Sequence, residues 1–208
     1  MPLTPGYGDT PLPDDELEAL LPHIAELVEE PVSKAAVYDL EQGVQEQVTE
    51  ELLTVVLDGN LGLDDLLNDF FLRDLRARLY GDIWAWAGVW CRHELNIGVA
   101  PEQVAVELRN SLDTIRYRRE HTTDWTAREL GIAVHAEAVG VHPFTDGNGR
   151  TTRLLADLVF TAAQDFDPLQ QYDWNVDKGR YIALLREYDR HRSVGELANF
   201  TPIRSVDA

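Results

Sequence analysis

Residues 142–153 gather the side chains that are best suited to chemistry on a phosphate. Their order is His-Pro-Phe-Thr-Asp-Gly-Asn-Gly-Arg-Thr-Thr-Arg, and apolar residues at helical spacing follow. The stretch therefore ends at the start of a helix, where unpaired backbone N–H groups and the positive end of the helix dipole favour a bound anion. Gly147 and Gly149 can adopt positive φ values, which lets backbone amides approach that anion closely.

The side chains of the same stretch add charge and a base. Arg150 and Arg153 lie about one helical turn apart and can bind further phosphate oxygens. The carboxylate of Asp146 can hold a magnesium ion against the phosphates, and His142 can accept a proton near neutral pH. The four residues from Asp146 to Gly149 are also a strong turn signal that suits a β-hairpin. The helical periodicity after Arg150 argues against such a hairpin.

The stretch resembles the signature of the Fic family, His-Pro-Phe-x-(Asp or Glu)-Gly-Asn-Gly-Arg-x-x-Arg, and every defined position of that pattern is filled here. Upstream, residues 71–88 resemble the helix and the Trp-Ala-Gly turn that precede a target-binding flap in this family. The next segment resembles the flap itself, with Asn96, Ile97, Gly98 and Val99. From Thr10 to about Phe200 the chain is similar to a small bacterial and archaeal subgroup known as mobile mystery protein B.

This resemblance implies a Mg²⁺-dependent protein adenylyltransferase, which moves AMP from ATP to a serine, threonine or tyrosine hydroxyl of a target protein. In such an enzyme His142 would be the general base, Asp146 would bind Mg²⁺, and the flap would clamp the target chain as an extra strand. The phosphate-binding residues would be Gly147, Asn148, Gly149, Arg150 and Arg153. An adenine pocket would be lined by Asn175 and Tyr181, together with Trp174.

Fic proteins are often silenced by a helix that carries (Ser or Thr)-x-x-x-Glu-(Gly or Asn), whose glutamate pairs with the second arginine of the signature. Two acids here fit part of that pattern. Glu41 lies in a Leu-Glu-Gln string like that of the subgroup, but Val37 stands where the hydroxyl residue is expected. Asp58 follows Thr54 at the right spacing, with a side chain that is one methylene shorter. We favour Glu41, although an acid on a helix also suits plain solvated surface.

The 208 residues suit one domain with an added helical arm. We expect an N-terminal tail and helical extension over residues 1–63 and a Fic core over residues 64–208. The fold class is predicted as all-α, with a small β-hairpin flap in the non-helical segment 90–99. The helices are expected to begin at residue 14 or 15 and to cover residues 32–57, 64–80, 102–120, 126–141, 150–164, 181–190 and 195–200.

Charge and composition limit the partners. The net charge is −19, and Lys34 and Lys178 are the two lysines, so the electrostatic field repels nucleic acid. Such an acidic surface suits an ordinary cytosolic protein and also a protein in concentrated salt. The longest apolar run, residues 83–91, is shorter than the roughly 20 residues that span a bilayer. No secretory signal precedes it, and the single Cys91 fits a reducing cytoplasm.

Other activities fit part of the pattern. A Doc-type phosphotransferase has Ala-Asn-Lys-Arg in place of Gly-Asn-Gly-Arg, so the intact glycines favour AMP transfer. Removal of AMP, a toxin-like role and a non-catalytic nucleotide-binding module are further alternatives, although a binding module does not need His142. A metal hydrolase using His135, His142 and Asp146 lacks a third histidine. The partners that the sequence leaves open are a regulatory protein and a second copy of the chain, through the Trp84–Trp90 cluster.

Overall fold

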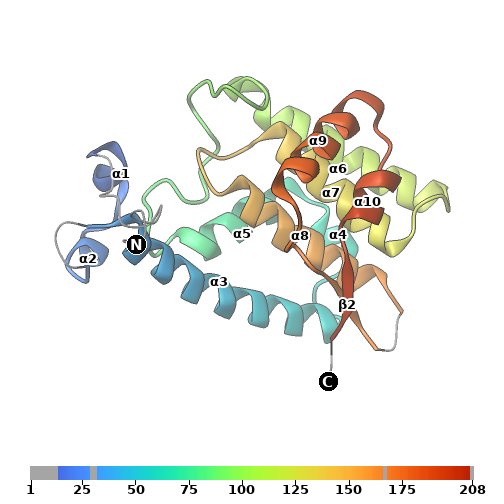
Figure 1. The fold of residues 1–208 in the computed structure, drawn as a ribbon, viewed down its shortest axis with the longest axis horizontal. Helices are drawn as coiled ribbons and strands as arrows, with labels where there is room; N and C mark the ends of the chain where they lie inside the picture. The colour runs from blue at the N-terminus through green and yellow to red at the C-terminus, as the bar shows by residue number, and fades with distance from the viewer. Residues whose placement is uncertain (1–13, 29–31, 166–167, 207–208) are drawn as a thin grey trace, which may run out of the picture. The chain divides into compact units, whose positions relative to one another are not determined.

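The computed structural model describes residues 14–28, 32–165 and 168–206, so the first thirteen residues of the predicted tail lie outside it. The predicted class is confirmed, because the fold is mostly helical with one two-stranded sheet (Figure 1). The helices are α1 (Asp14–Ala19), α2 (Pro22–Ala25), α3 (Lys34–Leu57), α4 (Leu63–Leu66), α5 (Asp69–Tyr80), the short 3-10 helix η1 (Pro101–Gln103), α6 (Val104–His121), α7 (Ala127–Val141), α8 (Asn148–Ala163), α9 (Lys178–His191) and α10 (Gly195–Phe200). None of these helices is long and apolar enough to cross a membrane.

The chain divides into two compact units, which are described separately. The first unit combines residues 1–51 with residues 73–89. Within it, the backbone N–H of Leu21 donates to the carbonyl of Ile83, and that of Ala85 donates to Ala19. The turn after α5 contains Gly88 at φ +71°, where a Cβ atom would lie 2.9 Å from the Cβ of Ala77. A glycine is therefore required to bring the Trp-Ala-Gly turn against α5.

The second unit combines residues 52–72 with residues 90–208, and α7 is its central helix. This helix packs against α6, α8, α9 and α10. Its small residues allow a close approach to α8, since a Cβ atom on Gly131 would lie 2.8 Å from the carbonyl oxygen of Ala156. The core of the unit is formed by apolar side chains from these helices and from the first strand, among them Ile132, Ala136, Phe160, Tyr172, Leu184 and Leu197.

Most helix limits agree with the sequence, and one does not. The helix predicted over residues 64–80 is interrupted between α4 and α5. The side chain of Asn68 accepts a 2.9 Å hydrogen bond from the backbone N–H of Phe70, so it caps α5 and starts a new helix. At α7 the Thr126 hydroxyl accepts from the backbone of Glu129, whose carboxylate accepts in turn from the Thr126 backbone. This capping box fixes the start of the central helix.

The position predicted for the hairpin is wrong. The two strands are β1 (Gln170–Tyr172) and β2 (Ile203–Ser205), which pair antiparallel with Gln171 opposite Arg204. Segment 90–99 contains no strand. Instead of pairing with itself, this segment is held at its two ends by the last residue of α7 and the loop that follows. The backbone N–H of Cys91 donates to the carbonyl of Pro143 at 2.8 Å, and that of Val99 donates to the carbonyl of Val141 at 3.2 Å.

Candidate functional site

The signature loop begins where α7 ends. His142 adopts the left-handed conformation, with φ 56° and ψ 58°, and its backbone N–H still donates to Ala138 in the last turn. His142 and Arg192 are the non-glycine residues with positive φ in the described part of the chain. This conformation is unfavourable by roughly 1–2 kcal/mol for a residue with a Cβ atom. A strained histidine at a helix end is therefore a candidate functional residue.

Asn148 braces the loop from inside. Its side chain is buried, its Oδ1 accepts from the backbone N–H of Phe144 at 2.8 Å, and its Nδ2 donates to the Phe144 carbonyl at 2.6 Å. Phe144 is also buried and stacks on Trp90 with a centroid separation of 5.3 Å. The side chain of Asn148 therefore holds the loop closed, and the backbone of the residue is left for the predicted anion nest.

The start of α8 has the geometry of an anion site. Gly147 caps the helix in the left-handed conformation, at φ 64° and ψ 12°, and has no side chain to fill the helix end. The helix pattern begins with Thr151, whose N–H donates to the Gly147 carbonyl at 3.1 Å. The N–H groups of Asn148 and Gly149 precede that bond, in the first turn of the helix, where the carbonyl partners of regular helix hydrogen bonds are missing.

The two arginines of the signature have different surroundings. The guanidinium of Arg150 lies 3.5 Å from the carboxylate of Asp146. The Nε of Arg153 donates to the Gly149 carbonyl at 2.9 Å, and its side chain lines a cavity. Asp146 is exposed, as a carboxylate that meets Mg²⁺ together with substrate phosphates would be. One protein carboxylate is enough for such an ion, since Mg²⁺ keeps waters and takes phosphate oxygens as its other ligands.

The metal-hydrolase alternative fails on geometry. The described residues contain no group of three or more histidine, cysteine, aspartate or glutamate side chains placed to hold an ion. The Nε2 of His135 forms a short hydrogen bond with the hydroxyl of Tyr181. Burial lowers the pKa of His135 to about 3, so this imidazole stays neutral. His135 thus belongs to the packed wall of a cavity, away from any cluster with His142 and Asp146.

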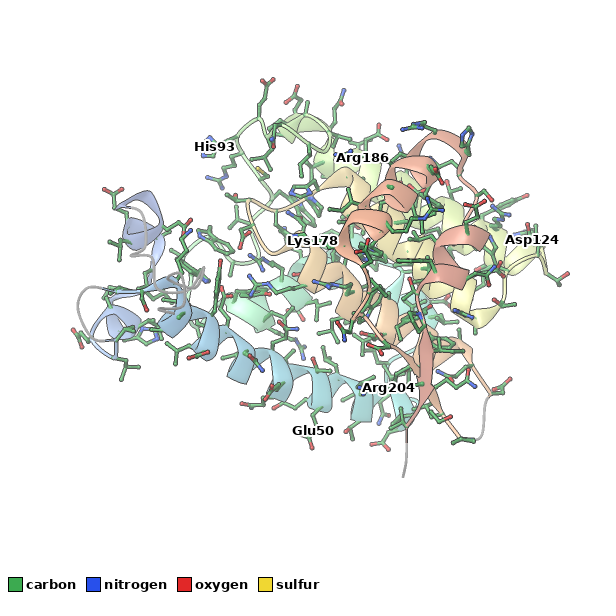
Figure 2. All side chains as sticks on the ribbon, viewed as in Figure 1. Glu50, His93, Asp124, Lys178, Arg186 and Arg204 are labelled. Atoms are coloured by element: carbon green, nitrogen blue, oxygen red, sulfur yellow. The ribbon has the colours of Figure 1, made fainter. Side chains whose placement is uncertain are left out.

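That cavity measures about 340 Å³ and joins the start of α8 to α9. Trp174 and Tyr181, two of the three residues named above for an adenine pocket, line this cavity, whereas the exposed Asn175 does not. Sequence reasoning missed Lys178, which lies in the first turn of α9 (Figure 2). The helical spacing of the α9 residues was the available signal, because positions i, i+3, i+4 and i+7 share one face. The full lining is His135, Val139, Gly149, Arg153, Trp174, Val176, Lys178, Tyr181, Ile182 and Leu185.

Residues 90–99 lie against His142. Gly98 has φ +88°, and a Cβ atom there would lie 2.5 Å from the Cβ of His142 and 2.8 Å from the carbonyl oxygen of Val141. The predicted flap is therefore next to the predicted base, with Asn96 and Ile97 exposed beside it. Partial burial lowers the pKa of His142, against a hydrogen bond with the backbone of Val139 and the charge of Asp146, which both raise it. The imidazole is thus mainly neutral at pH 7.

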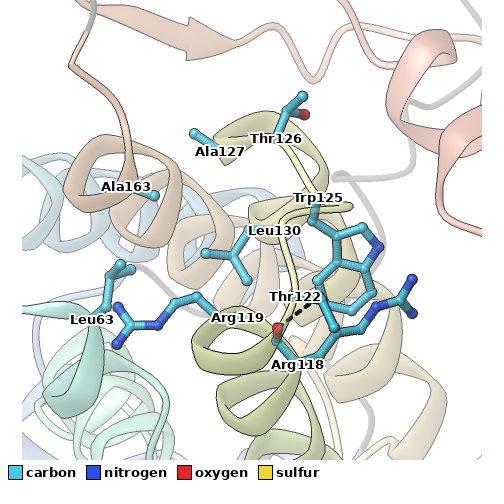
Figure 3. Close-up of a pocket in the computed structure, with 9 residues that line it drawn as sticks. All are labelled: Leu63, Arg118, Arg119, Thr122, Trp125, Thr126, Ala127, Leu130 and Ala163. Atoms are coloured by element: carbon cyan, nitrogen blue, oxygen red, sulfur yellow. Dashed lines mark hydrogen bonds between the residues drawn. The ribbon is translucent and has the colours of Figure 1, made fainter.

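A second cavity, of about 230 Å³, lies between α4, the end of α6 and the start of α7 (Figure 3). Trp125 and two arginines line it, and none of the signature residues does. The Arg118 guanidinium lies 4.0 Å from the centre of the Trp125 ring and pairs with Asp124, while Arg119 pairs with Asp64. Because carboxylates of the chain already compensate both charges, this cavity is a weaker candidate for a phosphate than the first one.

The two acids considered as inhibitors have opposite surroundings. Glu41 is buried in the first unit and accepts a 2.7 Å hydrogen bond from the indole Nε1 of Trp84. Asp58 is exposed just beyond the end of α3. A buried, hydrogen-bonded carboxylate is held in one position, whereas an exposed one is free to move. Their inhibitory roles stay predictions.

Several known proteins are similar to parts of this chain. Residues 67–160 match the model of the Fic/DOC family. A segment of 61 residues is 44% identical to the protein adenylyltransferase fic-1 of Caenorhabditis briggsae and 43% identical to that of Caenorhabditis elegans. These matches cover 29% of this chain and only 12% of either relative.

Solved structures share the fold. The N-terminal Fic domain of a VirB-translocated Bep effector protein from Bartonella quintana has a TM-score of 0.60 at 16% identity, over 81% of this chain and 83% of that one. The same domain with bound ADP has a TM-score of 0.58 at 15% identity, over 83% and 86% of the two chains. A Fic-domain signalling protein from Bacteroides thetaiotaomicron has a TM-score of 0.57 at 22% identity, over 77% and 62%. The signature loop, the helices on either side of it and the family match together show that residues 67–160 belong to a Fic/DOC family domain.

Proposed function

We propose that this protein is an adenylyltransferase, which moves AMP from ATP to a serine, threonine or tyrosine hydroxyl of a target protein and releases pyrophosphate. The observation that carries the proposal is the cavity in which Gly149 and Arg153 face aromatic residues of another segment. A nucleotide has phosphates at one end and an aromatic base at the other, and this cavity offers partners for both. The names of the fic-1 relatives support the same activity.

In this proposal the start of α8 binds the phosphates. The backbone N–H groups of residues 147–149 approach the negative charge, and the guanidinium groups of Arg150 and Arg153 bind the outer phosphates. The side chains of Trp174 and Tyr181 contact the base. Asp146 would hold Mg²⁺, which would neutralise part of the phosphate charge. Because the net charge of −19 repels ATP over long distances, these local positive groups carry more of the affinity than usual.

The chemistry falls to His142. Its neutral imidazole takes the proton from the target hydroxyl, the oxygen forms a bond to the α-phosphorus, and the bond from that phosphorus to the bridging oxygen breaks. Pyrophosphate leaves with the electron pair, and the imidazolium later loses its proton to water. The left-handed backbone and the contact with Gly98 hold the imidazole at the edge of segment 90–99.

We propose that the same segment docks the target. Residues 92–98 are exposed between two backbone anchors, Cys91 and Val99, so a partner chain can reach this segment. The carbonyl of His93 already accepts from the Cys91 thiol, which favours docking at the residues that follow it. An extended target chain pairing with Asn96–Val99 would form a strand pair in segment 90–99, which has no strand by itself. Its hydroxyl would then lie near His142.

Regulation by Glu41 is also part of the proposal, as are toxin-like activity and membership of the mystery-protein subgroup. Within the first unit, the hydrogen bond from Trp84 holds the buried carboxylate of Glu41 in one position. Asp58, which is exposed and shorter, is the second candidate. Replacing Glu41 by glycine removes both charge and contact, whereas glutamine keeps an acceptor for Trp84 and removes only the charge.

The test uses ATP labelled separately at the α- and γ-phosphates, with Mg²⁺, and measures label on protein, including the enzyme itself. Wild type should take label from the α-phosphate only, and His142→Ala should lower the rate by about 10²–10⁴. Asn175→Ala is the matched control, because this exposed residue does not line the cavity. If Glu41 inhibits, both Glu41→Gly and Glu41→Gln raise the rate.

The other outcomes separate the alternatives. Label from the γ-phosphate alone indicates a kinase-type phosphotransferase. Loss of AMP from a target modified beforehand, in the absence of ATP, indicates the reverse reaction. Binding of ATP without any label in wild type, Glu41→Gly and Glu41→Gln indicates a nucleotide-binding module.

A further inference from the structure

A carboxylate that the proposed reaction does not use lies beside the nucleotide cavity. Asp157 is on α8, one helical turn after Arg153. The indole Nε1 of Trp174 donates to both of its oxygens, at 2.9 Å to Oδ2 and 3.2 Å to Oδ1. Asp157 does not line the cavity, but Trp174 and Arg153 both do. Any effect of Asp157 on a nucleotide in the cavity would therefore act through Trp174 and Arg153.

The hydrogen bonds to Asp157 fix one wall of the cavity. The Trp174 ring packs against the rings of His135 and Tyr172, with centroid separations of 5.3 Å and 5.1 Å. The guanidinium carbon of Arg153 lies 6.0 Å from the centre of the same indole. With the indole nitrogen held by Asp157, the ring has one orientation against all three neighbours. Loss of the acceptor would leave a partly buried N–H without this partner.

The groups that act on the charge of Asp157 include two arginines and one backbone group, from three elements. Arg153 on α8 and Arg204 on β2 attract its carboxylate, and the backbone of Tyr172 on β1 forms a hydrogen bond with it. The Arg204 side chain is labelled in Figure 2. Burial nevertheless dominates and raises the pKa of Asp157 to about 7, with the bond from Trp174 acting in the opposite direction.

Nearby rings do not titrate in the same range. Burial lowers the pKa of His135 on α7 to about 3 and raises the pKa of Tyr181 on α9, so both are neutral at pH 7. Asp157, which contacts Trp174 from outside the cavity, thus changes its charge near neutral pH, whereas these two rings do not. Its charge acts on Arg153, which the proposed function assigns to the phosphates.

We propose that Asp157 is a positioning residue of the nucleotide cavity, and that gain or loss of its proton sets how tightly Trp174 and Arg153 hold a triphosphate. The inference rests on the proposed function, because it needs a nucleotide in this cavity. In both protonation states an oxygen of Asp157 accepts from Trp174, so the wall keeps its shape. What changes is the charge beside Arg153.

The direction follows from electrostatics. An ionised Asp157 compensates part of the Arg153 charge and repels phosphate, whereas a neutral Asp157 does neither. Affinity for a triphosphate should therefore fall as pH rises through about 7. By reciprocity, the bound triphosphate raises the pKa of Asp157, so binding takes up protons from solution.

The experiment is calorimetric binding of α,β-methylene-ATP between pH 6 and pH 8, to wild type and Asp157→Asn. This probe has a P–C bond in place of the bond that would break, so binding is measured without transfer. Asparagine keeps the acceptor for Trp174 and removes the charge. If binding raises the pKa of Asp157 by one unit, the Kd of wild type relative to the variant is about one at pH 6 and about fivefold at pH 8.

Two further readouts make the test specific. Titrations in buffers of different ionisation enthalpy should show that wild type takes up about 0.4 of a proton more than Asp157→Asn at pH 7. Ionisation of the ligand and of His142 is common to both proteins and cancels in the comparison. Trp174→Phe keeps an aromatic ring and removes the N–H donor that lowers the pKa of Asp157. The pH dependence of the Kd should therefore move to higher pH. If Asp157→Asn does not fold, this shift and the proton uptake of wild type carry the test.

The outcomes separate this inference from the proposed function. A ratio of Kd values that is constant from pH 6 to pH 8, with no difference in proton uptake, overturns the role of Asp157 while AMP transfer stands. Absence of binding to wild type at every pH overturns both. A pH-dependent ratio without AMP transfer in the labelling experiment supports Asp157 in a nucleotide-binding module.

Discussion

The backbone N–H of Val99 donates a 3.2 Å hydrogen bond to the carbonyl of Val141, the residue that directly precedes His142. The bond brings Gly98 onto the histidine, where there is no room for a side chain. The segment proposed to dock the target and the proposed base are therefore positioned by one contact. A substitution in the segment should therefore alter the position of His142, and a substitution at His142 should alter the segment.

Gly98→Ala should abolish this arrangement. The added methyl would lie 2.5 Å from the Cβ of His142, and the φ of +88° is unfavourable for alanine by about 1–3 kcal/mol. We expect a lower melting temperature and at least a tenfold loss of AMP transfer, measured with α-labelled ATP. Gly59→Ala is the matched control, because Gly59 has φ +72° and nothing within 4 Å of the added atom. If Gly98→Ala and Gly59→Ala lose the same fraction of AMP-transfer activity, the contact between Gly98 and His142 does not matter for activity.

Asn148→Ala should destabilise the signature loop. It removes two buried hydrogen bonds and leaves the N–H and C=O of Phe144 without these partners. We expect a loss of about 2–4 kcal/mol in the free energy of unfolding, measured with urea. Thr152→Val is the control, since this buried hydroxyl donates to the Asn148 carbonyl and its loss leaves a helix bond in place. Equal losses for the two variants would argue against a brace.

How far the sequence leads can be seen at this loop. Local spacing was enough to predict α7, α8 and the glycine turn between them, because helix periodicity and positive φ depend on nearby residues. The sequence of the loop did not predict that the side chain of Asn148 points inward, because this orientation depends on the buried backbone of Phe144. The sequence placed Asn148 in the anion nest and did not predict that its side chain also braces the loop.

Contacts between distant segments explain the other differences. The strands β1 and β2 have three residues each and are separated by two helices, so no alternating pattern marks them. Asp157 looked like one more polar residue on an amphipathic helix until Trp174 was placed against it. Asn175 and Trp174 are neighbours in the chain, yet only Trp174 reaches the cavity. Side-chain direction in a loop is not periodic and cannot be predicted from spacing.

The pH dependence of turnover should report His142. Burial lowers the pKa of His142 below its ordinary value of 6.5, and the residue acts as a base only when neutral. At saturating ATP, which removes the effect of pH on binding, kcat should rise with pH and level off, with a midpoint below 6.5. Initial rates with α-labelled ATP from pH 5 to pH 8 check this. A midpoint above 6.5, or a rate that falls as pH rises, would contradict the role of a neutral base.

Glu137 should couple stability to nucleotide affinity. Its carboxylate accepts from Ser111 on α6 at 3.0 Å, and from Tyr188 and Arg192 on and beside α9 at 2.9 Å and 2.8 Å. Since the Arg192 side chain is 56% exposed, most of the effect comes from the other two bonds. Glu137→Gln should lower the free energy of unfolding by about 1–2 kcal/mol.

The same change should reach the cavity, because α9 carries Lys178 and Tyr181. We expect a higher Kd for α,β-methylene-ATP. The change in kcat should be smaller, because His142 does not line this cavity. Asp74→Asn is the control: its pair with Arg78 is a half-exposed contact one helical turn away, and its loss should cost less than about 0.5 kcal/mol. If Glu137→Gln changes stability no more than this control, α9 is held by its apolar contacts alone.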